Sequence, residues 1–346
     1  MNGPFSYTGV PSPALNAELD RILKEIGGEI GRMQLPRLAG VVLGGGYGRG
    51  EGGVLHTPGG DRLYNDLDFF VFGDHAGKAD VQNITSALGT VSERWKERLG
   101  IEVDFGPVKN LTALGKVSST LMYQELRRGW RPVWGEADPE RWIPALEPAA
   151  IPFSEAVRLL VNRGMGLIFA GERLARKSQE ADFIVRNMNK TVLGCGDALL
   201  LVAGKYVWKC SERAAAFARH AEENRLPAEY AEAYRNAVHY KLEPVPVLPE
   251  DPAKEWRSCR QFFLDTVRRT AGTDDIADGL HRRAAGERSL KNLLRWLLKA
   301  RTFRPLCKLC DPPVVPVLET IWALLAAGED LPVCPEKLYR LWTRFN

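Results

Sequence analysis

The periodicity of the hydrophobic residues changes once along this chain, near residue 150. Before that point, short apolar or alternating segments at 38–43, 63–72 and 101–108 predict strands, with helices between and around them. From Ser154 onward the apolar residues recur only at helical spacing. The sequence therefore predicts an α+β fold, in which a mixed β-sheet domain is followed by an all-helical domain.

The length of 346 residues suits two domains. A proline-containing stretch at 144–152 separates the two patterns, so we expect domains at residues 1–148 and 149–346. The content of 45% hydrophobic and 26% charged residues, with no apolar run near about 18 residues, excludes collagen-like, disordered and membrane-bundle proteins. The N-terminus lacks the pattern of a signal peptide, so a cytoplasmic location is expected.

The net charge of +4 is unevenly distributed. Residues 1–150 contain 16 Lys and Arg against 19 Asp and Glu, whereas the remaining residues contain 31 against 24. The second half is therefore expected to favour an anionic partner. The six cysteines are too few for a disulfide framework in a chain of this length, and reduced thiols are predicted.

Three aspartates give the first half its predicted chemistry. Asp66 and Asp68 lie two positions apart on a predicted strand, so both carboxylates should point to one face. Asp104 can add a third carboxylate if its own predicted strand pairs beside the first. Hard oxygen ligands of this kind suit Mg²⁺, with Mn²⁺ as an alternative. Asp104 is also a candidate to orient or deprotonate an acceptor hydroxyl, although alternating acids on an exposed strand are common.

A glycine cluster follows the first predicted strand. Gly45 and Gly46 leave backbone N–H groups open, and glycine permits the close approach of phosphate oxygens. The segment 48–53 also satisfies the G-x-G-x-x-G dinucleotide fingerprint. That interpretation fails on context, because Pro58-Gly59-Gly60 interrupts the only span available for the required helix.

The order of these motifs resembles the DNA polymerase β nucleotidyltransferase superfamily over roughly the first 110 to 135 residues. The run Gly45-Gly46-Tyr47-Gly48-Arg49-Gly50-Glu51 is most similar to the nucleotidyltransferase domain of the PII-protein uridylyltransferases, where a Ser-Asp-x-Asp-Leu motif follows. Here Asn65-Asp66-Leu67-Asp68-Phe69 matches that second motif with Asn for Ser and Phe for Leu. The segment between the motifs is about nine residues longer than in that family. Nothing downstream in this sequence resembles the phosphohydrolase or regulatory domains of that family.

The resemblance implies transfer of a nucleotidyl group from an NTP. Asp66 and Asp68 would hold the metal ions, and Gly45 and Gly46 would carry the phosphates. Arg49 either contacts phosphate or pairs with Glu51 and fixes the loop. The helical half resembles that of single-substrate members such as aminoglycoside nucleotidyltransferases, in which a helical domain closes one side of the cleft.

Polar residues on apolar helices are the candidates in the second half. Lys190 is the favoured contact to the triphosphate, since this superfamily often brings a helical-domain lysine there, and Tyr206 is a candidate to stack on the base. The alternative for such residues is a position at the edge of a packed face. This alternative applies equally to Arg158, Asn162, Arg163, Arg186 and Asn189.

The segment 282–308 contains nine Lys and Arg against the single acid Glu287. RNA or an acidic protein could bind there, but a solvated helix face is favoured over both. Cys307 and Cys310 form one C-x-x-C without a second pair, so packing thiols are favoured over a zinc site.

The sequence thus predicts a Mg²⁺-dependent enzyme that moves an NMP, with AMP favoured, from an NTP to a hydroxyl of a small molecule or a protein, releasing pyrophosphate. The competing prediction is a non-catalytic nucleotide-binding or toxin–antitoxin module with the same fold. The expected partners are the NTP and the acceptor, without a membrane.

Overall fold

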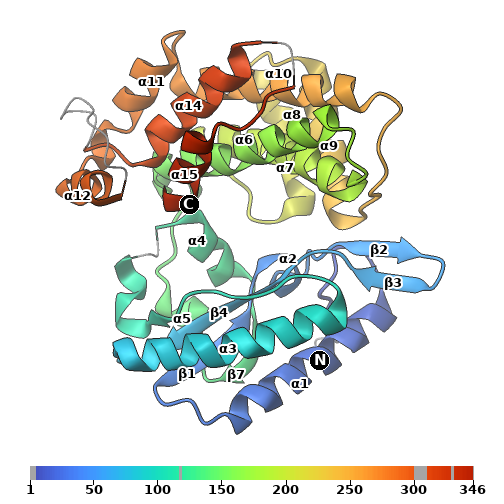
Figure 1. Ribbon diagram of the computed structural model, residues 1–346, viewed down its shortest axis with the longest axis vertical. Coiled ribbons are helices and arrows are strands. Elements are labelled where there is room, and N and C mark those ends of the chain that lie inside the picture. Colours follow the sequence, from blue (N-terminus) through green and yellow to red (C-terminus); the bar gives the residue numbers. More distant parts are fainter. Residues whose placement is uncertain (1–4, 117–118, 300–309, 329–330, 346) are drawn as a thin grey trace. The chain divides into compact units, whose positions relative to one another are not determined.

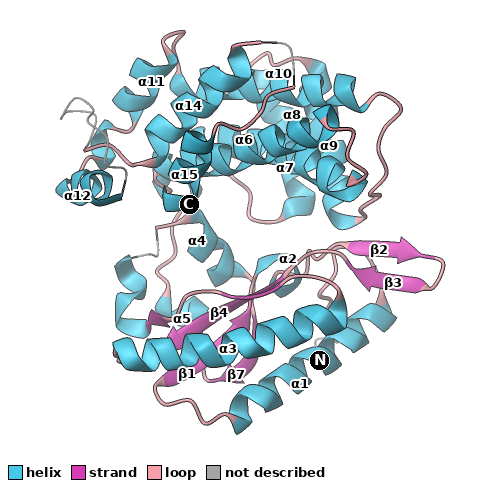
Figure 2. Cartoon of the chain, in the orientation of Figure 1, coloured by secondary structure: helices cyan, strands magenta, loops and turns pink. Residues whose placement is uncertain are grey.

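The computed structural model describes residues 5–116, 119–299, 310–328 and 331–345. Helices are combined with a mixed β-sheet (Figures 1 and 2), which confirms the predicted combination of helices and sheet. The chain divides into two compact units. The first contains Met1–Leu146 and His239–Val245, and the second contains Glu147–Val238 and Pro246–Asn346. The break after Leu146 lies two residues before the predicted boundary, but the return of 239–245 to the first unit was not predicted.

The sheet of the first unit is mixed, in the order β5-β4-β1-β7. The central strand β1 is antiparallel to both β4 and β7, whereas β5 and the short β6 are parallel to β4. The strands are β1 (Leu38–Leu43), β4 (Leu67–Gly73), β5 (Val103–Phe105), β6 (Lys109–Asn110) and β7 (Arg131–Gly135).

Two predicted strands are shorter in the structure. The segment 63–72 is divided, because Leu63 ends the strand β3 (Gly60–Leu63), which forms a separate hairpin with β2 (Val54–Thr57). The hairpin turn uses Gly60 at φ +108°, in the left-handed region that glycine adopts readily. The segment 101–108 pairs with β4 only over β5, since Pro107 lacks the N–H needed to continue a ladder.

The two faces of the sheet bury different residues. Leu67, Phe69 and Val71 pack with α1 (Pro13–Arg32) and α3 (Lys78–Leu99). The side chains that alternate with them, including Phe72, pack on the opposite face with Val42, Tyr123 and Leu126. The shorter elements of this unit are α2 (Gly45–Gly48), η1 (Leu111–Lys116), α4 (Leu121–Arg128) and α5 (Pro139–Trp142).

The second unit is helical throughout its described residues, as the spacing predicts. The long helix α10 (Pro252–Ala271) begins at ordinary signals: Asp251 accepts a hydrogen bond from the Lys254 N–H, and Pro252 occupies the first turn. No helix in the described residues combines the length and apolarity needed to cross a membrane. The helices are α6 (Phe153–Ala175), α7 (Ala181–Val202), α8 (Cys210–Glu223), α9 (Ala228–Leu242), α10 (Pro252–Ala271), α11 (Ile276–Arg283), α12 (Leu290–Lys299), α14 (Val314–Ala326) and α15 (Glu336–Phe345), with short turns η2 (Pro148–Ala150) and η3 (Ala285–Glu287).

Candidate functional site

Two of the predicted acids lie on neighbouring strands. Asp68 of β4 and Asp104 of β5 are direct partners in the parallel register. In-register residues of paired strands share a face, and this face is opposite to the one that buries Leu67 and Phe69. Asp68 is half-buried and Asp104 is exposed. The predicted pairing of the two strands is therefore confirmed, and it brings two carboxylates to one edge of the sheet.

Asp66 has a different position from the one the sequence predicted. It precedes β4 by one residue instead of lying within the strand, because β3 ends at Leu63 and the chain then turns. Two contacts fix this turn: the Tyr64 N–H donates to the Tyr47 hydroxyl at 2.9 Å, and the Asn65 Oδ1 accepts from the Gly53 N–H at 2.7 Å. Asp66 therefore lies at the end of this turn, directly before the strand that carries Asp68.

Gly45 touches the Asp68 carboxylate directly. The Gly44 N–H first donates to the Asp68 carbonyl oxygen at 2.8 Å, which continues the β1 edge into the turn. Gly45 then has φ +60°, and a Cβ at this position would lie 2.0 Å from Asp68 Oδ2. Both the backbone conformation and the close approach require glycine.

The neighbouring Gly46 has no such requirement. The nearest atom to a Cβ at this position would be the Glu51 carbonyl oxygen, at 3.4 Å, and φ lies outside the left-handed region. The fold would therefore accommodate a methyl group at residue 46. Glycine at this position leaves the backbone of residue 46 uncovered by a side chain.

Arg49 pairs with two glutamates. Its Nε lies 3.4 Å from Glu51 Oε2, and its Nη1 lies 3.2 Å from Glu125 Oε2 on α4. The Glu51 side chain is 8% exposed, so an unpaired charge there would be costly. Of the two roles considered for Arg49, these contacts favour fixing the loop over binding phosphate.

The side chain of Tyr47 stabilises the glycine loop. The residue is fully buried, and its hydroxyl donates to the Gly53 carbonyl at 2.8 Å. Burial raises the pKa of Tyr47 to about 12, so the hydroxyl stays neutral and can donate. A Cβ at Gly52 would lie 2.0 Å from the Tyr47 ring, which explains the glycine there. The tyrosine therefore fixes the loop beside Asp68.

A segment from the second half of the sequence completes this site. Lys241, near the end of α9, belongs to the first unit, and its Nζ lies 3.7 Å from Glu51 Oε2. The neighbouring Tyr240 hydroxyl lies 2.6 Å from the Tyr64 hydroxyl. Sequence reasoning missed both residues. The helical pattern of 228–242 contains no signal that its last turn joins another unit.

Lys190 and Tyr206 belong to the second unit. Lys190 is half-buried on α7. Tyr206 is only 3% exposed, and its hydroxyl accepts a hydrogen bond from Arg213 Nη1 at 2.6 Å. The same Arg213 nitrogen lies 2.7 Å from Asp197 Oδ2. A tyrosine enclosed in this buried network has no open ring face for a base, so these contacts correct the predicted stacking role.

Several other polar candidates have structural partners. Arg158 lies 3.2 Å from Glu155, and Asn162 accepts a hydrogen bond from Trp342 Nε1 at 3.0 Å. In the basic segment, Arg288 lies 2.6 Å from Asp311. Cys307 and all three cations of this segment after Lys299 lie outside the described residues, so the C-x-x-C and the full basic stripe stay predictions.

The sheet offers two neighbouring carboxylates to a divalent metal. In the described part of the chain, no three His, Cys, Asp or Glu side chains are grouped in a way that could hold an ion. The structure brings together Asp68 and Asp104, with Asp66 outside the strand. Two carboxylates suit Mg²⁺, which usually takes one or two from the protein and fills its shell with water and phosphate oxygens.

Comparisons with known proteins add no family assignment. No family model matches the chain, and neither the curated proteins nor the solved structures give a match.

Proposed function

We propose that the first unit catalyses transfer of a nucleoside monophosphate from an NTP to a hydroxyl group, with release of pyrophosphate. One observation carries this proposal: Asp68 and Asp104 are register partners on parallel strands, and Asp68 touches Gly45 at the start of the Gly45-Gly46 turn. Two acids next to open backbone offer a place for a metal and for phosphate oxygens. The resemblance of the two motifs to the nucleotidyltransferases supports the same chemistry.

In this proposal the acceptor oxygen attacks the α-phosphorus of the NTP. The bond between that phosphorus and the oxygen bridging to the β-phosphate breaks, and pyrophosphate leaves. Asp104 takes the proton of the acceptor hydroxyl, for which its exposed position is suitable. Asp68, with Asp66, would hold Mg²⁺ or Mn²⁺, which neutralises phosphate charge and lowers the pKa of the attacking hydroxyl. Gly46 leaves room for phosphate oxygens to reach the backbone.

ATP is the proposed donor, and the acceptor is a small molecule or a protein. A non-catalytic nucleotide-binding module is the competing function. Binding of nucleotide without pyrophosphate release would decide for it.

The test is transfer of label from each α-³²P-labelled NTP with Mg²⁺ or Mn²⁺, with and without cell extract. Asp68→Asn and Asp104→Asn should each lower transfer by about 100-fold or more. The matched control is Glu102→Gln, since Glu102 is an exposed acid next to β5 whose carboxylate pairs with Lys96 at 2.9 Å. Wild-type transfer by either aspartate variant would overturn the proposed site.

A further inference from the structure

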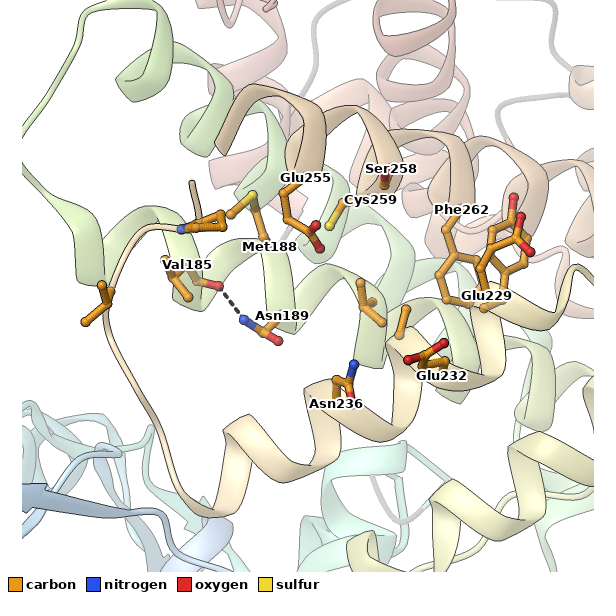
Figure 3. Close-up of a pocket in the computed structure, with 15 residues that line it drawn as sticks. Val185, Met188, Asn189, Glu229, Glu232, Asn236, Glu255, Ser258, Cys259 and Phe262 are labelled. Atoms are coloured by element: carbon orange, nitrogen blue, oxygen red, sulfur yellow. Dashed lines mark hydrogen bonds between the residues drawn. The ribbon is translucent and has the colours of Figure 1, made fainter. Parts of the chain in front are cut away.

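A cavity of about 430 Å³ lies within the second unit, far along the sequence from the acids of the sheet. Its walls come from α7, α9 and α10 and from the connector at 247–249 (Figure 3). All of the residues that line the cavity belong to the second unit. The volume is in the range of pockets that bind small organic molecules.

One part of the wall is apolar and aromatic. Val185, Met188 and Val192 of α7 line it together with Phe262 of α10. Phe262 stacks on Tyr230, with ring centroids 4.1 Å apart and an interplanar angle of 11°. This side of the cavity can accept a hydrocarbon or aromatic body.

Val247 extends this apolar wall along the connector. Its residue surface is 68% exposed although it lines the cavity. A molecule bound in the cavity can cover an apolar side chain that borders the cavity and also faces solvent. Removing this apolar surface from water makes the free energy of binding more favourable. The connector therefore offers apolar contact near the opening.

The other part of the wall is acidic. Glu229 and Glu232 of α9 and Glu255 of α10 line the cavity, and no lysine, arginine or histidine is among the lining residues. Within the described residues, none of these three glutamates forms an ion pair with the chain. Asn189 and Asn236 add amide groups that point into the cavity from α7 and α9 (Figure 3).

The sign of this charge differs from that of its surroundings. Residues 151–346 contain 31 Lys and Arg against 24 Asp and Glu, so this half of the sequence has a net positive charge. The described residues that line the cavity nevertheless include three acids and no cation. All three glutamates are exposed, so they can attract a cation from solvent, and salt screens this attraction.

We propose that this cavity binds a small organic cation, in which a protonated amine is attached to an apolar body. The body lies against Met188, Val192 and Phe262, and the ammonium group faces the acidic part of the wall. The amide oxygens of Asn189 and Asn236 are available as further acceptors for its N–H groups. Buried Cys259 contributes only as an apolar wall, since burial raises the pKa of its thiol well above the usual range.

The proposal does not depend on nucleotidyl transfer, because all of its residues lie in the second unit. Binding of an amine ligand alone tests the site. The probe is dansylcadaverine, a fluorescent naphthalene with one primary ammonium group. Its matched anion is dansyl-6-aminohexanoate, which has the same fluorophore and a carboxylate in place of the amine.

We expect saturable binding of dansylcadaverine with a blue shift of its emission, and weaker binding of the anion by at least about tenfold. Raised salt should weaken binding of the cation. The double variant Glu232→Gln/Glu255→Gln should weaken it by about tenfold while keeping the wild-type circular dichroism. The control Glu222→Gln, an exposed acid of α8 that does not line the cavity, should bind as the wild type.

Equal binding of the anion would show an apolar pocket without charge selection and would overturn the proposal, as would failure of dansylcadaverine to bind. A second variant guards against a general loss of surface charge. Val192→Trp should fill the cavity from its apolar side and abolish binding with all three glutamates present. Undiminished binding by a folded Val192→Trp protein would place the probe elsewhere.

Discussion

Gly45 and Asp68 are in direct contact, such that a Cβ at residue 45 would lie 2.0 Å from the Asp68 Oδ2 atom. The contact joins the two sequence motifs through residues that lie more than twenty positions apart. Because Asp68 is the register partner of Asp104, the position of the glycine turn also limits where the acidic pair can lie.

Gly45→Ala should therefore impair both folding and activity. Alanine at φ +60° costs about 1–2 kcal/mol, and its methyl group must displace the Asp68 carboxylate. We expect a lower free energy of unfolding in urea and a loss of pyrophosphate release larger than the loss of stability explains.

Gly46→Ala is the matched substitution one residue away. The nearest contact of its methyl group would be 3.4 Å, so the unfolding midpoint should stay within about 0.5 kcal/mol of the wild type. If phosphate approaches this backbone, the dissociation constant of the NTP should nevertheless rise, as measured by calorimetry. Unchanged NTP affinity in this variant would move the phosphates away from Gly46.

Removal of the Arg49 side chain should destabilise the glycine loop. Arg49→Met leaves Glu51 and Glu125 without this partner, and Glu51 is largely buried. We expect a loss of about 1–3 kcal/mol in urea unfolding, limited by the Lys241 ammonium group 3.7 Å from Glu51.

The double variant Arg49→Met/Glu125→Gln serves as the control for this interpretation. Neutralising the Glu125 carboxylate, which has lost its Arg49 partner, should recover part of the lost free energy of unfolding. Removing both partners of a pair costs less than removing one. A double variant as unstable as the sum of two independent changes would argue against a coupled pair.

The hairpin β2–β3 should be most stable in mildly acidic solution. Hydrogen bonds to Asp61, and then to Glu243, raise the pKa of His56 above its ordinary value of about 6.5. This contribution is complete below that value and is lost as the pH rises through the higher pKa of the folded state. The Ser12 hydroxyl and His56 lower the pKa of Asp61, so its contribution is present above about 3.9 and is lost as the pH falls through the lower folded value.

Amide exchange of the hairpin should therefore be slowest, after correction for the intrinsic rate, between about pH 4 and 6.5. NMR titration of the His56 ring checks the cause directly. Its pKa should lie above 6.5 in the wild type and decrease in Asp61→Asn. A His56 that titrates at or below its ordinary value in the wild type would contradict this account.

The part of the site that could be predicted from the sequence depends on local signals. The strand β1 ends where the apolar run meets Gly44, and the strand that carries Asp104 follows from its alternation, although alternation does not tell which strands pair. Asp66 was predicted within the strand but directly precedes it, because its turn is fixed by hydrogen bonds from Tyr64 to Tyr47 and from Gly53 to Asn65. These contacts join residues 12 to 17 positions apart, and periodicity does not report them.

Burial in the helical unit was equally hard to predict. The helical period gives the face on which a residue lies, but it does not give the neighbours that cover that face. Tyr206 is enclosed through Arg213, which lies one helix further along the chain. Asp197, the ion-pair partner of Arg213, also accepts a hydrogen bond from Tyr234 at 2.5 Å. A partly polar sequence pattern here marks a buried network and not a ligand site.

The last prediction concerns which lysine meets the triphosphate. Lys241 and Lys190 are both in the helical half of the sequence, but only Lys241 belongs to the unit that contains the glycine turn. Its carbonyl oxygen would lie 2.8 Å from a Cβ at Gly53, and its side chain is 21% exposed beside Glu51. We therefore expect Lys241→Ala to raise the dissociation constant of the NTP by about tenfold and to reduce its salt dependence. Lys24→Ala, at an exposed lysine of α1, should have no effect on either quantity. If Lys241 only neutralises Glu51, its removal lowers the urea midpoint and leaves NTP affinity unchanged, and calorimetry beside the unfolding curve distinguishes the two roles.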